Sequence, residues 1–324
     1  MVAAAVSSSA RAELFRLLGD EDRLRLLALC AEEELTVGEL ATLLDEAQPQ
    51  VTRKSQPLRD AGLLVARKDG TRTLLSTSLD EHDAVLRAAL DEGRALCTRD
   101  GSLARIAAVV RAREDHARRF FDSSTPSTPS ASAVVHDAVA PLLSIVAPLL
   151  PGRALAVDVG TGEGAWLPLL SPLYDRVVAV DRSPARLARC ADRVAHAGLG
   201  NVRLREGDVD SSALLEEVQR HGGADLVLVA RVLHHAARPQ DALVAAASLT
   251  KHGGHVVVVD YLPHDDESLR EQGDVWLGFD PLRLRDLVRG AGLDVVAMHP
   301  ISIPDTHPLQ IVVGKKERHD GRPH

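Results

Sequence analysis

Apolar residues in the first 62 positions recur at helical spacing. One helix should begin at a cap provided by Asp20 or Asp22, and a second, shorter helix should begin at Thr36. A third should run from about Gln48 to Ala61 and end at Gly62. The apolar positions that set this spacing are Leu24, Leu26, Leu27, Leu29, Leu40, Leu43 and Leu44.

Two short strand-like runs, Leu63–Lys68 and Thr71–Ser76, flank Asp69-Gly70. Asp-Gly suits a type I′ turn, so this stretch predicts a β-hairpin. Residues 81–121 predict two helices separated near Asp100-Gly101. Three helices and a hairpin in this order predict a winged helix-turn-helix, whose second helix of the pair enters the major groove of DNA.

A Ser/Thr/Pro-rich stretch at residues 123–132 has no apolar periodicity and predicts an exposed linker. After it, strand and helix patterns alternate, which predicts a parallel, doubly wound α/β sheet with ligands at its carboxyl edge. We therefore expect domains at 1–122 and 133–316, and a disordered tail at 317–324. The expected strands are Leu155–Val159, Arg176–Val180, Val202–Glu206, Ala224–Ala230, His255–Asp260, Asp294–His299 and Gln310–Val313.

The composition fits a two-domain globular protein: 324 residues, 45% hydrophobic and 26% charged. Cys30, Cys97 and Cys190 are scattered, which argues against a disulfide framework and a thiolate metal site. No run approaches the roughly 20 apolar residues of a membrane span, and no basic leader precedes an apolar core. These patterns predict a cytoplasmic protein without a membrane partner.

The net charge of −8 is unevenly distributed. Residues 1–47 carry four arginines against ten acids, whereas residues 48–76 carry six basic residues against only two acids. Because the local field decides whether DNA binds, this basic segment keeps DNA open as a partner.

The richest signal is the segment Ala156–Gly164, an apolar strand that breaks into closely spaced glycines. A second strand ends at Asp181, whose carboxylate is placed to accept hydrogen bonds from ribose hydroxyls. The glycines fit both a loose dinucleotide pattern and, as Gly160-x-Gly162-x-Gly164, the S-adenosylmethionine pattern. Asp158 favours the second, because a carboxylate repels a pyrophosphate and attracts the ammonium of a methionine moiety.

Leu18–Leu27, Leu35–Leu40, Gln48–Arg53 and Leu58–Leu64 closely resemble the ArsR-type repressor family, over roughly residues 10–80. The resemblance implies double-stranded operator DNA as a partner and a homodimer formed by helices in the 1–20 and 81–121 regions. It places Gln48, Gln50, Thr52, Arg53 and Lys54 on the DNA-reading helix, and Arg67, Lys68 and Arg72 on the wing.

Three departures from that family change what we expect. Metal-sensing members carry Cys-x-Cys where this chain has Thr36-Val-Gly38, and Asp80-x-His82 lacks a matching histidine pair. We therefore expect no metal. Pro57 removes a hydrogen bond to the carbonyl of Arg53 and predicts a kink in the reading helix.

The glycine loop, Asp181 and Gly207-Asp208-Val209 together resemble class I methyltransferases, in which such an aspartate receives the adenine amino group. The resemblance implies S-adenosylmethionine or S-adenosylhomocysteine as cofactor, bound by Asp158, Gly160, Gly162, Gly164, Asp181, Arg182, Asp208, Val209 and Ala230. Ala224–His235, Gly253-Gly254 and Asp260–Phe279 extend the resemblance to a bacterial group in which an ArsR-type domain is fused to a methyltransferase.

His234 and His235, with Arg231, follow the fourth strand at the edge where a methyl acceptor would enter, and His264 follows the fifth. Any of the three histidines could be a catalytic base, since histidine titrates near neutrality. The alternative is that at least one of the first two only caps a helix or hydrogen-bonds within its loop. Trp276 and Phe279 are expected to roof the site.

Two functions fit these patterns. The first is a DNA-binding transcriptional regulator whose methyltransferase domain binds S-adenosylmethionine or S-adenosylhomocysteine, and either senses it or methylates a small molecule. The second is a small-molecule methyltransferase whose winged-helix domain serves only dimerisation. The residues identify no methyl acceptor.

Overall fold

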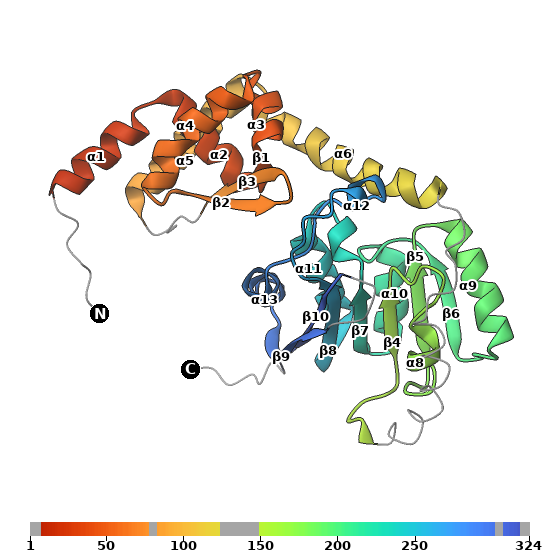
Figure 1. Ribbon diagram of the computed structural model, residues 1–324. Coiled ribbons are helices and arrows are strands. Elements are labelled where there is room, and N and C mark those ends of the chain that lie inside the picture. The colour runs from red at the N-terminus through yellow and green to blue at the C-terminus, as the bar shows by residue number, and fades with distance from the viewer. Residues whose placement is uncertain (1–7, 78–82, 124–148, 302–306, 318–324) are drawn as a thin grey trace, which may run out of the picture. The chain divides into compact units, whose positions relative to one another are not determined.

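The computed structural model describes residues 8–77, 83–123, 149–301 and 307–317. The chain divides into two units, residues 1–112 and 113–324, so the boundary falls inside one long helix, α6 (Ser102–Ser123) (Figure 1). The linker expected at 123–132 lies, from residue 124 on, outside the described residues. The tail lies outside them from residue 318 on.

The first unit consists of helices around a three-stranded sheet with the strand order β1-β3-β2. Its elements are α1 (Ser8–Leu18), α2 (Glu21–Glu32), β1 (Leu35–Thr36), α3 (Val37–Leu44), α4 (Gln48–Asp60), β2 (Leu64–Asp69), β3 (Arg72–Thr77), α5 (Ala84–Arg99) and the first half of α6.

The expected caps set the helix boundaries in this unit. The carboxylate of Asp20 accepts the backbone N–H groups of the first turn of α2, at 3.0 and 3.1 Å. Thr36 and Glu39 form a reciprocal capping box on α3, which satisfies two N–H groups that a helix start leaves unbonded. After α4 the chain turns at Gly62, whose φ of +71° favours glycine. α4 itself continues through Pro57 to Asp60.

The hairpin exists, but its predicted turn type is wrong. Asp69 pairs with Arg72, so the two residues of the turn are Gly70 and Thr71. Gly70 has a φ of +60°, whereas Thr71 is not in the left-handed region. A type I′ turn needs positive φ at both positions. The turn is therefore type II′, with Gly70 at its first central position. Asp69 ends a strand, where its buried carboxylate lies 3.7 Å from the guanidinium of Arg67.

The second unit is built on a seven-stranded sheet with the order β6-β5-β4-β7-β8-β10-β9. Its strands are β4 (Ala156–Val159), β5 (Val177–Asp181), β6 (Val202–Glu206), β7 (Ala224–Ala230), β8 (Thr250–Tyr261), β9 (Asp294–Ile301) and β10 (Leu309–Lys315). Its helices are α8 (Leu167–Leu170), α9 (Pro184–His196), α10 (Ser212–Arg220), the 3₁₀ turn η2 (Leu233–His235), α11 (Pro239–Leu249), α12 (Ser268–Glu271) and α13 (Pro281–Gly290).

All seven expected strands are present, and the Rossmann-like α/β fold is confirmed with one difference. β10 runs antiparallel to both of its neighbours, β8 and β9. Only residues 302–308 separate β9 from β10, and a parallel connection needs a crossover of a dozen or more residues. The last strand therefore returns alongside its neighbour as a hairpin partner.

Both faces of this sheet are covered. Leu167 of α8 and Cys190 of α9 pack on one face, against Ala156, Val177 and neighbouring side chains. The alternate residues of the strands, including Val157 and Val178, are fully buried as well, and α11 and α13 contact strands β7 to β10. β4 and its neighbours are thus held rigidly, with their carboxyl ends at one edge.

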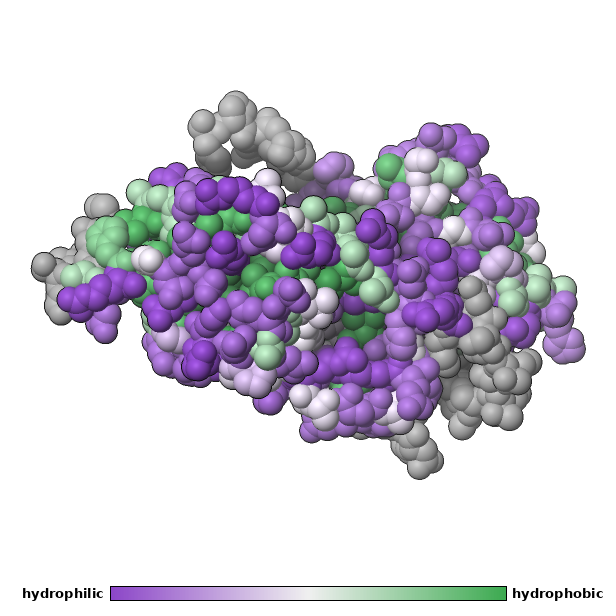
Figure 2. Space-filling view, turned by 90° about the horizontal axis from the view of Figure 1, so that it is seen from above, coloured by the Kyte–Doolittle hydropathy of each residue, from purple (hydrophilic) through white to green (hydrophobic). Residues whose placement is uncertain are grey.

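Most of the surface facing the viewer in Figure 2 is hydrophilic, and hydrophobic side chains lie deeper between the hydrophilic ones. Among the described residues, no helix has the length and apolar character needed to cross a membrane.

Candidate functional site: a nucleoside pocket and a helix with an exposed polar face

Three glycines after β4 form a tight loop at the carboxyl edge of the sheet. Gly160, Gly162 and Gly164 have φ values of +64°, +56° and +80°, which side chains disfavour. A Cβ at Gly160 would lie 2.6 Å from Val232, and one at Gly164 would lie 2.7 Å from the sulfur of Cys190. The loop therefore needs glycine for its conformation at all three positions and for close packing at two of them.

Asp181 links this loop to the end of β5. Its Oδ2 accepts the backbone N–H of Gly162 at 2.7 Å, and its Oδ1 accepts the N–H of Ser183 at 2.9 Å. A carboxylate has about four lone-pair positions, so both oxygens can still accept a ligand hydroxyl. Two fixed N–H donors thus orient a carboxylate that forms part of a pocket wall.

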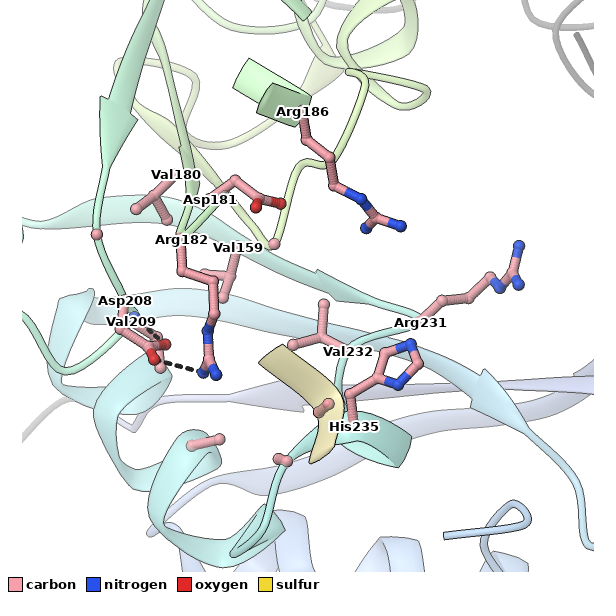
Figure 3. Close-up of a pocket in the computed structure, with 15 residues that line it drawn as sticks. Val159, Val180, Asp181, Arg182, Arg186, Asp208, Val209, Arg231, Val232 and His235 are labelled. Atoms are coloured by element: carbon pink, nitrogen blue, oxygen red, sulfur yellow. Dashed lines mark hydrogen bonds and ion pairs between the residues drawn. The ribbon is translucent and has the colours of Figure 1, made fainter. Parts of the chain in front are cut away.

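The next strand contributes a second carboxylate. Asp208 follows β6, its Oδ1 accepts the N–H of Val209 at 2.8 Å, and its Oδ2 forms an ion pair with Arg182 (Figure 3). Arg182 comes from the end of β5, so this pair joins two neighbouring strand ends across the pocket.

These groups line a cavity of about 90 Å³ at the carboxyl edge of the sheet. Of the expected cofactor residues, five line it: Gly160, Asp181, Arg182, Asp208 and Val209. Asp158, Gly162, Gly164 and Ala230 lie outside its wall. Sequence reasoning missed Ala117, Arg186 and Val232, which also line the cavity.

Asp158 lies in the buried strand β4, with only 1% of its surface exposed. Its Oδ2 accepts the hydroxyl of Thr161 at 2.6 Å. Burial raises the pKa of this carboxyl to about 7, and the nearby charge of Asp181 acts in the same direction. Asp158 is therefore poised between its neutral and charged forms near neutrality.

Arg231 is the first residue after β7, and it adopts a strained backbone conformation with a φ of +58°. Its guanidinium lies 5.1 Å from the ring centroid of Tyr261 and hydrogen-bonds the tyrosine hydroxyl. Arg231 and Arg186 both line the cavity, so together with Arg182 they give its wall three cations (Figure 3).

His235 lines the same cavity. Its Nδ1 lies 3.0 Å from the carbonyl oxygen of Gly273, which can only accept, so Nδ1 carries the proton in this contact. Burial, followed by the neighbouring His234, lowers the pKa of His235 well below its ordinary value. The ring is consequently neutral near pH 7.

The three candidate catalytic histidines do not share one position. His234 is buried outside the cavity wall, and its Nδ1 lies 2.7 Å from Asp260 Oδ1. The ring of Tyr261 contacts His234 at 4.9 Å between centroids and His264 at 5.5 Å. Only His235 of the three therefore forms part of the cavity wall.

The expectation that Trp276 and Phe279 roof the site is wrong. Both are at most 2% exposed, and neither lines the cavity. The indole Nε1 of Trp276 donates to the carbonyl of Ala236 at 2.7 Å, and Arg283 lies over both aromatic rings. Trp276 and Phe279 are therefore core residues of the second unit.

The second half of α6 also contributes to this site. Ala117 is buried and lines the cavity, and the ring Nε2 of His116 lies 2.6 Å from the carbonyl oxygen of Arg270. Arg113 lies over the ring of Trp276, 5.3 Å from its centroid. The periodicity of α6 predicts a helix but does not show what the helix covers.

In the first unit, the residues expected to contact DNA have different surroundings. Gln48, Gln50, Thr52 and Arg53 are exposed on α4. Lys54 is half-buried, and its Nζ lies 2.8 Å from Asp22 and 2.6 Å from Glu46.

The wing shows the same contrast. Arg67 is held by Glu34, 3.1 Å from its Nε, whereas Lys68 and Arg72 are exposed. Among the described residues, no carboxylate pairs with Lys68 or with Arg53 of α4. Arg53 and Lys68 are therefore the basic side chains best placed to meet a phosphate.

Comparison with known proteins gives matches for both parts of the chain. Residues 157–258 match the methyltransferase domain family. The N-terminal region is 46% identical over 59 residues to the arsenical resistance operon repressor of Escherichia coli, which is 18% of this chain and 50% of that protein. It is 37% identical over 82 residues to the HTH-type transcriptional regulator KmtR of Mycobacterium tuberculosis, 24% of this chain and 62% of that protein.

This chain thus spans between half and two thirds of the length of these two regulators. One similar solved structure is the N-methyltransferase NodS from Bradyrhizobium japonicum in complex with S-adenosyl-L-homocysteine. That structure is 16% identical, with a TM-score of 0.46, over 64% of this chain and 99% of that one.

The two matches lie in separate parts of the chain, in the order that the sequence motifs predict. The chain carries a methyltransferase domain, and its N-terminal region matches ArsR-type regulators, as expected for an ArsR-type helix-turn-helix unit fused to a methyltransferase.

Proposed function

We propose that this protein is a DNA-binding transcriptional regulator whose methyltransferase domain binds S-adenosylmethionine or S-adenosylhomocysteine. The observation that carries the cofactor half is the pair of carboxylates, Asp181 and Asp208, at adjacent strand ends around one cavity. The glycine loop lies beside them, and its first glycine, Gly160, forms part of the cavity wall.

In this proposal Asp181 accepts the ribose hydroxyls. Asp208 accepts the adenine amino group, and the backbone of Val209 meets the ring. Asp158, whose pKa of about 7 makes it mainly charged above neutrality, attracts the ammonium of the methionine moiety. The sulfonium of S-adenosylmethionine makes its methyl group transferable, and the chain's own residues need mainly to hold the nucleoside in line with an acceptor.

For the DNA half, α4 is the recognition helix and the hairpin β2–β3 is the wing. The exposed side chains of Gln50 and Arg53 suit contacts with base edges and phosphates in the major groove. A two-fold dimer would place two such helices about 34–36 Å apart, one turn of DNA. The operator would then be an inverted repeat.

One helix gives the two activities a physical connection. In the first unit, Arg105 of α6 donates to the carbonyl of Leu43 at 2.6 Å, at the end of α3. In the second unit, Ala117 of the same helix lines the nucleoside cavity. A cofactor that displaces or orders residues 113–117 would therefore act on a helix that also packs beside the helix-turn-helix.

A second candidate function is methylation of a small molecule, with the winged helix serving only dimerisation. The observation that favours it is the lining of the cavity, because Arg231 and the neutral ring of His235 form part of its wall as well as the carboxylates. A neutral imidazole at this edge can accept a proton from an acceptor hydroxyl or amine.

Two measurements on the full chain distinguish these functions. Calorimetric titration with S-adenosylhomocysteine tests the pocket, and a gel shift with DNA selected from random duplexes tests the helix-turn-helix. The regulator proposal expects binding in both. Cofactor binding without retention of any duplex at low salt would leave the methyltransferase alternative.

A further inference from the structure

Beside the nucleoside cavity lies a buried cluster of two histidines and an aspartate that the cofactor does not account for. His234, His235 and Asp274 each offer a ligand atom, and these atoms all lie within 4.8 Å of one another. His234 is 2% exposed and Asp274 is 4% exposed. Buried groups of this kind are normally hydrogen-bonded to one another or hold a metal.

The distances within the cluster are too long for good hydrogen bonds. His234 Nε2 lies 3.8 Å from Asp274 Oδ1, and His235 Nδ1 lies 3.4 Å from the same oxygen. Two ligands held tetrahedrally at about 2.0–2.1 Å from one zinc ion are about 3.4 Å apart. The spacing therefore suits ligands that share an ion better than partners that share a proton.

Asp274 supplies an independent observation. Its Oδ2 is buried and has no hydrogen-bond partner among the residues that the structure describes. An unsatisfied buried carboxylate oxygen is costly, and each such atom in a native protein calls for a ligand or water.

The surroundings of His234 also resemble the outer contacts of metal sites. Asp260 is fully buried, and its Oδ1 lies 2.7 Å from His234 Nδ1, which leaves Nε2 directed to the cluster. A metal-bound histidine usually donates its other ring N–H to such a carboxylate, which fixes the ring and raises its basicity.

Backbone hydrogen bonds bring the three side chains together from distant parts of the sequence. Asp260 Oδ2 accepts the N–H groups of Leu233 and His234 at 3.0 and 3.3 Å, which anchors the 3₁₀ turn after β7. The N–H groups of Val275 and Trp276 donate to the carbonyl of His234 at 2.9 and 3.0 Å. These bonds hold Asp274 beside both rings.

We propose that His234, His235 and Asp274 form a binding site for a divalent transition-metal ion of the Zn²⁺ type. Two imidazole nitrogens and one carboxylate oxygen are ligands that zinc and its neighbours accept, and three protein ligands leave a position for an exogenous oxygen. With Asp260, two carboxylates balance the two charges of the ion. When His235 Nδ1 binds the ion, it no longer donates to the carbonyl of Gly273, and the neutral ring carries its proton at Nε2 instead.

This site stands on its own geometry and does not depend on the proposed regulator function. Because His235 also lines the nucleoside cavity, an ion here would lie at the edge of that cavity. Its open position is suited to a hydroxyl, thiol or carboxylate ligand.

The test is metal loading of the full chain, freed of metal by a chelator and titrated with Zn²⁺ alone. Calorimetry and elemental analysis give the stoichiometry, and Co²⁺ gives the visible absorption bands of a tetrahedral site. Asp274→Asn preserves the shape of the side chain, and His235→Gln removes a second ligand. His307→Asn is the matched control, because His307 pairs with Asp266 outside the cluster.

We expect the wild type and His307→Asn to bind one equivalent more Zn²⁺ than either Asp274→Asn or His235→Gln. The Co²⁺ bands should be lost in the latter two variants. The thermal unfolding midpoint of each variant, followed by circular dichroism, checks that the chain is folded. If the two ligand variants load as much metal as the wild type, or if the wild type binds none, the proposal is overturned.

Discussion

Replacement of Asp181 by alanine gives a direct measure of the nucleoside pocket. The carboxylate lines the cavity, and its oxygens are oriented by the N–H groups of Gly162 and Ser183. A hydrogen bond to a charged group contributes about 1.5–3 kcal/mol. Loss of two ribose hydrogen bonds therefore costs about 3–6 kcal/mol, which weakens Kd for S-adenosylhomocysteine by about 10²- to 10⁴-fold.

Calorimetric titration of the full chain measures this effect. Asp181→Asn keeps the shape and an acceptor oxygen but loses the charge, so its Kd should fall between those of the wild type and the alanine variant. Asp192→Ala, an exposed change on α9, removes the same charge away from the cavity and should bind normally. If Asp181→Ala binds S-adenosylhomocysteine as tightly as the wild type, the assignment of this cavity is incorrect.

Two further predictions concern single side chains. Burial raises the pKa of Asp158 to about 7, so the folded chain keeps a proton that the unfolded chain releases. The stability contribution of Asp158 should fall by about 1.4 kcal/mol per pH unit as pH rises from about 4 to 7. Asp158→Asn should cancel this slope in denaturant unfolding followed by tryptophan fluorescence, since both tryptophans lie in the second unit; equal slopes would contradict the burial argument. On DNA, Arg53→Ala should reduce the salt slope of binding by about 0.9, the contribution of one phosphate contact. Lys54→Ala should change that slope less, because Asp22 and Glu46 already hold its ammonium. Fluorescence anisotropy over a range of salt concentrations compares the two, and the reverse order would contradict this assignment.

The strands and helix caps could be predicted because local physics determines them. Thr36 followed by Glu39 is a capping box wherever the helix packs, and valine-rich runs such as Val177–Asp181 form buried strands. The turn type was harder, since a turn at Asp69-Gly70 would pair Lys68 with Thr71, whereas Lys68 pairs with Thr73, and this shift of two residues leaves every side chain on the same face. Hydrophobic periodicity does not resolve a shift of that size in a short hairpin.

The candidate site was only partly predictable, because several of its members come from distant segments. Asp181 and Asp208 follow strands and belong to a spaced motif, so the sequence shows them. Arg186 lies within α9, and Ala117 lies on a helix far away in the sequence, where nothing distinguishes it from other alanines. Their place in the wall depends on tertiary packing.

The histidine cluster illustrates the same limit. His234 and His235 are adjacent, but Asp274 is about forty positions away and fits no metal-binding spacing. The expectation of no metal relied on local motifs alone. Only the hydrogen bonds of Val275 and Trp276 to His234 bring the aspartate to the two rings.

The link between cofactor and DNA is tested most directly by titrating S-adenosylhomocysteine into the full chain with and without its operator duplex. If α6 connects the two units energetically, operator DNA should change cofactor affinity, and cofactor should change operator affinity by the same factor. A coupling of about 1–3 kcal/mol, or about 5- to 150-fold in Kd, is the expected range. An unchanged Kd in both directions, for S-adenosylmethionine as well, would show that the nucleoside pocket does not regulate DNA binding.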